Sequence, residues 1–333
     1  MATGNIRIGI SGWRYTGWRG AFYPKGLRQR QELDFASRMM PTIEINGSFY
    51  SLQRPEYYSA WRDATPEGFV FSVKAHKRIT HQKRLKDVDS AVANFLASGL
   101  LELRDKLGPI LWQFPPMLPF KPERFEAFFA SLPHDTEHAG EIARRHDSAM
   151  AKRASVAVDK KRPLRHAVEI RHPSFIDDAF IAMLRRYRIA LVVADTAGKW
   201  PLLEDLTADF VYVRLHGDEE LYASGYSDAA LDRWATRFDA WSQGQQVADV
   251  HLASAEPAPA RAKRDIYCYF DNDVKVHAPY DAATLARKLG LDSPLGEKGT
   301  ESWPPGWDAA VPRARAQGFG KPRSERGPSL PIA

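Results

Sequence analysis

The feature that most constrains the fold is a regular alternation of short, β-branched apolar segments with helical segments. None of the apolar segments leads directly into a hairpin, and this order predicts right-handed crossovers and a parallel sheet. Eight such units over about 290 residues fit a (β/α)8 TIM-type barrel better than an open doubly wound sheet, since no G-x-G-x-x-G motif follows any strand. The expected strands cover residues 6–10, 42–46, 69–74, 109–114, 167–171, 189–194, 210–215 and 266–270.

The segment A-V-E-I-R-H-P-S-F at 167–175 joins one strand to the next helix. Glu169 and Arg171 alternate with apolar residues, which is the two-residue period of a strand. The proline ends the strand, because it has no N–H to donate. Ser174 is then expected to cap a helix that runs to Arg186. A carboxylate and a guanidinium therefore lie where a strand gives way to a helix, the position at which barrel enzymes keep their sites.

Two stretches interrupt the alternation and carry the positive charge. The formal net charge is +6. Residues 141–166 hold eight Lys/Arg and three acids, or +5, and residues 311–333 hold five Lys/Arg and one acid, or +4, which leaves −3 for the rest. We interpret 134–164 as a helical, basic insertion after the fourth βα unit, and 293–333 as a disordered basic tail. The body of the chain is therefore not basic.

Residues 1–292, which include the insertion at 134–164, are expected to form a single barrel domain. Because the insertion and the tail are highly charged, both are expected to contribute little to the core. Deleting residues 295–333 should then shift the melting temperature only slightly. A loss of soluble protein would instead indicate that Trp303 and Trp307 are docked.

Composition indicates an ordinary globular protein, with 44% hydrophobic and 26% charged residues. No run approaches the roughly 20 apolar residues of a membrane span, so no membrane partner is expected. The single cysteine, Cys268, excludes an internal disulfide and fits a reducing compartment. No signal-peptide pattern follows Met1. These features predict a cytoplasmic location and leave the oligomeric state open.

Polar residues on the expected strands share a common parity. Strands of a parallel barrel are buried on both faces, so polar residues within them require an explanation. Their alternation with apolar neighbours points them into the barrel, and nearly all lie near the carboxyl ends of the strands. We expect one cavity to be surrounded by Glu44, Asn46, Lys74, Gln113, Glu169, Arg171, Asp195, Arg214, His216 and Asp271.

A series of ordered motifs resembles the YecE-like family, a family of unknown function. The motifs include I-S-G-W-R-Y, T-I-E-I-N-G-S-F-Y, W-Q-F-P-P, V-E-I-R-H-P-S-F, Y-V-R-L-H-G and Y-F-D-N-D, and they span about residues 6 to 290. The resemblance implies a TIM-type barrel similar to the endonuclease IV and xylose isomerase group. It brings no known reaction.

Three kinds of chemistry remain open for such a site. Metal-assisted hydrolysis of a phosphodiester would use carboxylate and imidazole side chains as ligands of a divalent metal. The sequence is compatible with such a metal and does not require one. A metal-free sugar or sugar-phosphate enzyme would use a glutamate as general base. A non-catalytic protein would bind a small ligand or nucleic acid, with its basic insertion and tail supplying affinity that does not depend on nucleic-acid sequence. The candidate catalytic residues are Glu44, Glu169, Asp195 and His216, and Asp271 joins them as a candidate metal ligand.

A phosphate-containing ligand is the leading hypothesis, because arginines and a basic segment at 74–86 converge on the same end of the barrel. That ligand could be a phosphodiester, a nucleotide or nucleic acid, and aromatic residues could stack on its rings. The candidate ligand-binding residues are Arg171, Arg214, Lys74, His81, Asn46, Gln113, Trp13, Tyr50 and Asn272.

A purely structural explanation stands beside these hypotheses. Buried arginines can simply pair with buried carboxylates across a barrel and perform no chemistry. If internal carboxylates already pair both Arg171 and Arg214, the site is closed to anions. The structure then favours a paired structural layer.

Overall fold

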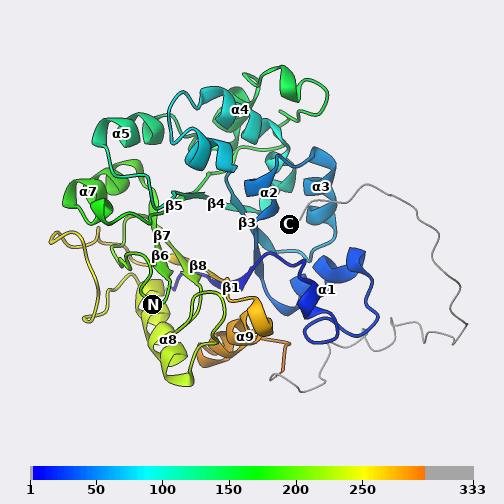
Figure 1. Ribbon diagram of the computed structural model, residues 1–333, viewed down its shortest axis with the longest axis vertical. Coiled ribbons are helices and arrows are strands. Elements are labelled where there is room, and N and C mark those ends of the chain that lie inside the picture. The colour runs from blue at the N-terminus through cyan, green and yellow to red at the C-terminus, as the bar shows by residue number, and fades with distance from the viewer. Residues whose placement is uncertain (1–2, 297–333) are drawn as a thin grey trace, which may run out of the picture.

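The computed structural model describes residues 3–296, which form a closed barrel of eight parallel strands (Figure 1). The strands are hydrogen-bonded in chain order, and β1 closes the barrel by pairing with β8. The predicted (β/α)8 architecture is therefore confirmed. The strands are β1 (Ile6–Ser11), β2 (Thr42–Ile45), β3 (Val70–Lys74), β4 (Leu107–Gln113), β5 (His166–Glu169), β6 (Ala190–Asp195), β7 (Phe210–Leu215) and β8 (Asp265–Phe270).

Helices surround the barrel and cover its outer face (Figure 1). Among residues 3–296, no helix is long and apolar enough to cross a membrane. The helices are α1 (Glu32–Met39), α2 (Gly47–Tyr50), α3 (Pro55–Asp63), α4 (Asp89–Ala97), α5 (Pro122–Ala130), α6 (Thr136–Ala143), α7 (Asp178–Tyr187), α8 (Asp228–Ser242) and α9 (Ala278–Lys288).

The barrel interior is filled by a distinct cluster of side chains. Small residues such as Ala167 and Ala190 leave room for the large rings of Tyr212 and Tyr269, whose centroids lie 5.1 Å apart. The hydroxyl of Tyr269 lies 2.8 Å from Oγ1 of Thr42, so this buried polar group is satisfied. These rings form a solid floor beneath the carboxyl ends of the strands.

The helix after β5 begins later than the sequence predicts. Residues Pro173–Phe175 form a single 3₁₀ turn, and α7 begins at Asp178. Oδ1 of Asp177 accepts hydrogen bonds from two backbone N–H groups of the first helical turn, at 2.7 and 3.2 Å. Asp177 is therefore the N-cap, and the expectation that Ser174 caps the helix is wrong. Oγ of Ser174 instead accepts a hydrogen bond from the backbone of Phe120.

The insertion at 134–164 is part of the core, contrary to the expectation from its charge. Helix α6 packs against α4, and its inward face carries the fully buried Ala139 and Ala143. Met150 follows in the 3₁₀ turn Ser148–Met150 and is also fully buried. The small alanines let the helix approach closely, so a few apolar residues suffice to dock a segment whose exposed face is charged.

Replacing Met150 by alanine is expected to lower the free energy of unfolding by about 2–4 kcal/mol, because a buried side chain is lost and a cavity remains. Chemical denaturation would measure this loss. Met117, which is 59% exposed, offers a matched control whose replacement should change stability by less than about 0.5 kcal/mol. Equal, small effects at both positions would show that the insertion is only peripheral.

The sequence predicts a tail that begins at residue 293, but the first residues of this stretch are docked. Leu295 is 4% exposed, and its carbonyl accepts a hydrogen bond from Nη1 of Arg287. A truncation that starts at 295 would remove this contact, so the small shift in melting temperature is better tested by a truncation after residue 296. Trp303 and Trp307 lie outside the described residues.

Candidate functional site

A ring of polar side chains closes the carboxyl end of the barrel. These residues occupy inward positions on their strands, two residues beyond the tyrosine floor. On β3, for example, Ser72 contacts the hydroxyl of Tyr212 at 2.6 Å, and Lys74 has the same parity. We call this set the polar ring: Ser11, Glu44, Lys74, Gln113, Glu169, Arg214 and Asp271.

Arg214 is the centre of the polar ring. Its guanidinium donates to Glu44 at 2.9 and 3.2 Å and to Glu169 at 2.8 Å. It also donates to Asp271 at 2.8 Å and to Ser11 at 3.2 Å. The side chain is 1% exposed, and every nitrogen that can donate has an acceptor. Arg214 therefore joins three carboxylates from different strands and is not free to bind an external anion.

The carboxylates of Glu44 and Glu169 are also hydrogen-bonded to several donors within the protein. Besides Arg214, Glu44 accepts hydrogen bonds from Ser11 at 2.7 Å and from Tyr212 at 2.6 Å. Oε1 of Glu169 accepts from Gln113 at 2.8 Å and from Arg171 at 2.9 Å. Each carboxylate oxygen thus has at least one donor. Every carboxylate oxygen of these glutamates already accepts a hydrogen bond, which argues against the role of metal ligand or base that the sequence suggested.

Electrostatics reinforce this conclusion. Burial by itself would raise the pKa of Glu169, but the guanidiniums of Arg171 and Arg214 outweigh burial and hold this pKa well below its ordinary value. Burial also opposes ionisation of Asp271, and Arg214 and His216 overcome it in the same way, so its pKa is lowered. Carboxylates with such low pKa values are weak bases near neutral pH.

His216 completes the inner part of the network. It is fully buried, with Nδ1 3.1 Å from Oδ2 of Asp271 and Nε2 3.4 Å from Nη1 of Arg214. Across the part of the chain that the structure describes, no three His, Cys, Asp or Glu side chains come together as a group that could hold a metal ion. Four of the five predicted metal ligands, Glu44, Glu169, His216 and Asp271, are thus neighbours of Arg214.

Lys74 differs from every other member of the polar ring. Its side chain is only 8% exposed, yet within residues 3–296 its ammonium has neither a hydrogen-bond acceptor nor an ion pair. The ammonium lies over the ring of Phe49, 4.6 Å from its centroid. Burial and the neighbouring guanidinium of Arg214 lower the pKa of Lys74 to about 8, although the surrounding carboxylates partly oppose this.

Arg171 and His81 lie beside Lys74 at the outer edge of the ring. Arg171 is 12% exposed at its side chain, uses Nε and Nη2 for one oxygen of Glu169, and lies 3.8 Å above the ring of Trp200. Nη1 of Arg171 has no partner among the described residues. His81 is placed by the π-helical turn Arg78–Gln82. Partial burial, then Lys74 and Arg171, lower its pKa to about 4, so the imidazole is neutral at physiological pH.

Asp195 does not join this group. On β6 the residues that face the interior are Ala190, Val192 and Ala194, so Asp195 has the opposite parity. Its Oδ2 accepts a hydrogen bond from the hydroxyl of Tyr226 at 3.1 Å. The expectation that Asp195 shares the cavity is wrong, because an all-apolar strand carries no alternation from which parity could be assigned.

Other predicted ligand contacts have structural roles. Trp13 is 1% exposed and packs edge-on against Trp61 at 5.3 Å, so it is a core residue. Asn272 is fully buried and donates to the backbone of the loop before α8 and to Asp281. Tyr50 differs from these two: it is 58% exposed, and its ring meets that of Phe49, which contacts Lys74, edge-on at 5.1 Å.

Two predicted ligand-binding residues are found at the polar ring: Asn46 contacts it, and Gln113 belongs to it. Nδ2 of Asn46 donates to Ser11 at 2.6 Å, while its Oδ1 is buried without a partner among the described residues. Gln113 donates to Glu169 at 2.8 Å, which occupies its amide nitrogen.

Sequence reasoning missed Tyr222 and Trp200. Tyr222 adopts a left-handed backbone with φ 65°, and its ring meets that of His216 edge-on at 5.2 Å. Burial, followed by the charge of Asp271, raises the pKa of Tyr222. Both residues lie in loops after strand ends, and no periodic pattern marks such positions. The only signal available was an aromatic residue in the loop after a strand.

The fold and this site define a (β/α)8-barrel protein with a charged carboxyl-end mouth. The chain belongs to the family described as "Protein of unknown function DUF72", which matches residues 7–302. The resemblance to the YecE-like family is thereby confirmed.

Two curated relatives match part of the chain. The UPF0759 protein YunF of Bacillus subtilis is 33% identical over 123 residues, covering 35% of this chain and 43% of the relative. The UPF0759 protein YecE of Escherichia coli is 29% identical over 150 residues, covering 44% and 51%. The aligned region thus spans about half the length of the curated relatives.

Solved structures support the same fold. A DUF72 family protein from Thermotoga maritima superposes with a TM-score of 0.63 and 23% identity, covering 86% of this chain and 99% of that protein. One from Enterococcus faecalis gives a TM-score of 0.58 and 16% identity, covering 88% and 100%. At these identities the likeness concerns the fold alone.

Proposed function

We propose that the mouth binds a small anionic ligand that carries a phosphate group, held by Lys74 and the outer edge of Arg171. The observation that carries this proposal is the ammonium of Lys74, a residue only 8% exposed, which contacts the ring of Phe49 but has no hydrogen-bond acceptor among the described residues. An ammonium with little access to water and no acceptor is costly, and an anion bound in front of it would reduce that cost.

The position of the ligand differs from the one expected from sequence. Both arginines contact internal carboxylates, so the paired-layer explanation accounts for Arg214, Glu44 and Glu169. The anion is therefore assigned to the outer side of the ring, where Nη1 of Arg171 has no partner in the described chain. Lys74 and Arg171 together suit the several oxygens of a phosphate.

The arrangement supports binding more than hydrolysis. Hydrolysis of a phosphodiester needs an activated water, and the carboxylates that would activate it are engaged with Arg214 and have lowered pKa values at Glu169 and Asp271. Hydrolysis is therefore not part of the proposed function.

Isothermal titration calorimetry with inorganic phosphate and a sugar phosphate would test the proposal. Replacing Lys74 by glutamine is expected to weaken binding about 10- to 100-fold, because a charge-assisted hydrogen bond is worth about 1.5–3 kcal/mol. Lys161, which is 62% exposed and precedes β5 at the opposite end of the barrel, provides the control Lys161→Gln, which should bind as the wild type does. Unchanged binding by Lys74→Gln would reject the mouth as the anion site.

Short single-stranded DNA provides the comparison for the nucleic-acid alternative. Binding through the basic insertion and tail would depend steeply on salt and would survive Lys74→Gln. Such a result, without phosphate binding at the mouth, would favour a nucleic-acid-binding protein.

A second candidate, metal-free chemistry on a sugar phosphate, is favoured by one observation. With its pKa lowered to about 8, a measurable fraction of Lys74 is neutral amine near neutral pH and could act as a base in place of the occupied glutamates. Abstraction of a proton next to a ketose carbonyl would exchange that proton with solvent. Proton NMR in D2O with a chelator present should then show deuterium incorporation that Lys74→Gln abolishes.

A further inference from the structure

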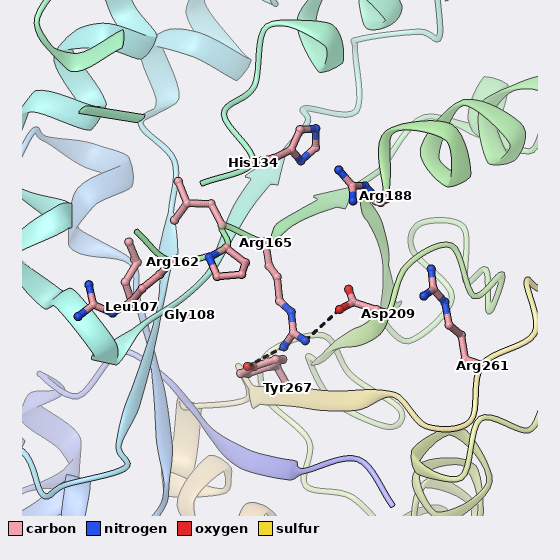
Figure 2. Close-up of a pocket in the computed structure, with 11 residues that line it drawn as sticks. Leu107, Gly108, His134, Arg162, Arg165, Arg188, Asp209, Arg261 and Tyr267 are labelled. Atoms are coloured by element: carbon pink, nitrogen blue, oxygen red, sulfur yellow. Dashed lines mark hydrogen bonds and ion pairs between the residues drawn. The ribbon is translucent and has the colours of Figure 1, made fainter. Parts of the chain in front are cut away.

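A cavity lies at the end of the barrel opposite the polar ring, where the strands begin. It has a volume of about 490 Å³ and is lined by residues near the starts of β4, β7 and β8, by the end of the insertion and by the residue after α7 (Figure 2). We call it the basal pocket. This volume is that of a site for a small molecule rather than of an extended groove.

Arginines dominate the lining of the basal pocket. Arg162, Arg165, Arg188 and Arg261 all line it, whereas Asp209 is the one carboxylate among its lining residues. Figure 2 shows Arg165, Arg188 and Arg261 projecting from three separate segments around Asp209. The lining therefore carries an excess of positive charge that its own acid does not balance.

Two of these arginines already have partners. Arg165 donates to Asp265 at 2.8 Å, to Asp209 at 3.1 Å and to the hydroxyl of Tyr267 at 3.2 Å. Arg162 makes a two-pronged contact with Asp159, at 2.7 and 2.8 Å. Both guanidiniums are held in fixed positions, and Asp209 is itself engaged by Arg165.

The other two guanidiniums are free. Both residues are exposed, and neither Arg188 nor Arg261 forms an ion pair or a side-chain hydrogen bond with any residue in the range 3–296. Arg188 follows α7, and Arg261 lies on the connection between α8 and β8. Two unpaired guanidiniums on different segments thus border one cavity, beside a third that is fixed in place.

The backbone of Arg188 adds an independent observation. This residue ends α7 in a left-handed conformation, with φ 54° and ψ 39°. Glycine is the residue best suited to this position, and a side chain here strains the backbone. Because Arg188 is exposed and its side chain contacts no partner, this side chain does little for folding, and it borders the pocket.

We propose that the basal pocket binds a compound with several phosphate charges, such as a di- or triphosphate. Arg188 and Arg261 would each meet one part of the charged chain, and Arg165, positioned by Asp209 and Asp265, would form the floor. A single small anion cannot satisfy two guanidiniums that come from separate segments as well as a linked phosphate chain can. The site is at the amino ends of the strands and does not depend on the function proposed for the mouth.

The experiment uses the full-length protein carrying Lys74→Gln, so that binding at the mouth does not contribute. Sodium tripolyphosphate is titrated by calorimetry and compared with inorganic phosphate, a nucleoside triphosphate and a short single-stranded oligonucleotide. Tripolyphosphate is expected to bind more tightly than monophosphate. Arg188→Gly and Arg261→Gln should each weaken its binding at least tenfold. Tighter binding of the nucleoside triphosphate would identify the pocket as a nucleotide site.

The stability of Arg188→Gly separates binding from folding. Because glycine relieves the left-handed backbone, this variant should melt at the same temperature as its parent or higher in the absence of ligand. Arg186, which is on the same helix and pairs with Glu126, provides the control Arg186→Gln, which should retain full tripolyphosphate binding. The proposal is overturned if tripolyphosphate does not bind, if the Arg188 and Arg261 variants bind it normally, if Arg188→Gly melts at a lower temperature, or if only the oligonucleotide binds.

Discussion

Replacing Arg214 by methionine is expected to lower the free energy of unfolding by about 3–5 kcal/mol at pH 7, which makes it among the most damaging single changes. The guanidinium is 1% exposed and contacts Glu44, Glu169 and Asp271 at 2.8 to 2.9 Å. Its removal leaves three buried carboxylates without their common partner. Urea denaturation of the wild type and the variant would measure the loss.

The pH dependence of this effect provides a second measurement. In the wild type the pKa values of Glu169 and Asp271 are lowered, so both groups remain ionised at pH 5. In the variant, Glu169 keeps Arg171 and Asp271 keeps His216, but burial is less strongly opposed, so both pKa values should rise relative to the wild type and protonation should cost the folded state less as the pH falls. The difference between the two proteins should therefore shrink from pH 7 to pH 5.

Arg38 provides a control for the Arg214 prediction. It is 51% exposed and pairs with Asp34 one helical turn away, so Arg38→Met should cost less than about 0.5 kcal/mol. A loss below about 1 kcal/mol for Arg214→Met would contradict the assignment of Arg214 as the centre of the polar ring.

Replacing Lys74 by methionine should have the opposite effect and raise the free energy of unfolding. The difference between its ordinary pKa of 10.5 and about 8 in the folded protein corresponds to about 3 kcal/mol, as an order of magnitude. The folded state disfavours the charged form, so this cost is fully present below pH 8. Methionine would remove the cost and still cover the ring of Phe49.

The sign of the pH dependence follows from the direction of the shift. Between pH 8 and pH 10.5 the unfolded chain binds more protons at Lys74 than the folded protein does, so wild-type stability should rise with pH in this window. In Lys74→Met this rise should disappear, and the two proteins should converge above about pH 10.5. Denaturation at pH 7, 9 and 10.5 would measure it. A variant less stable than the wild type at pH 7 would show that Lys74 supports the fold.

The two predictions together separate structure from function within one ring. Arg214 stabilises the barrel, whereas Lys74 destabilises it in the absence of a ligand. A residue retained at a cost to stability is typical of a binding or catalytic site. For this reason the proposed anion site consists of the Lys74 ammonium and Nη1 of Arg171, and it does not include Arg214.

The pattern of residues along the chain was enough to predict the barrel and most of the polar ring. The two-residue period of a strand is a local property, so neighbouring residues alone assign Glu44, Glu169 and Arg214 to the inner face. The same rule failed at Asp195, because β6 is apolar on both faces and offers no alternation. The charge of the insertion also led to a wrong expectation, that this segment contributes little to the core. Its packing is decided by the buried Met150 and two buried alanines.

What the sequence could not determine is which side chains would meet. Closure of the barrel brings β2, β5, β7 and β8 to one point, and only there does Arg214 acquire three carboxylate partners while Lys74 acquires none. Periodicity follows from the local geometry of the backbone and can be read from adjacent residues. Pairing across the barrel depends on distances between residues more than 100 positions apart in the chain, such as Arg214 and Glu44. Those distances, and with them the charge left unpaired, exist only in the folded protein.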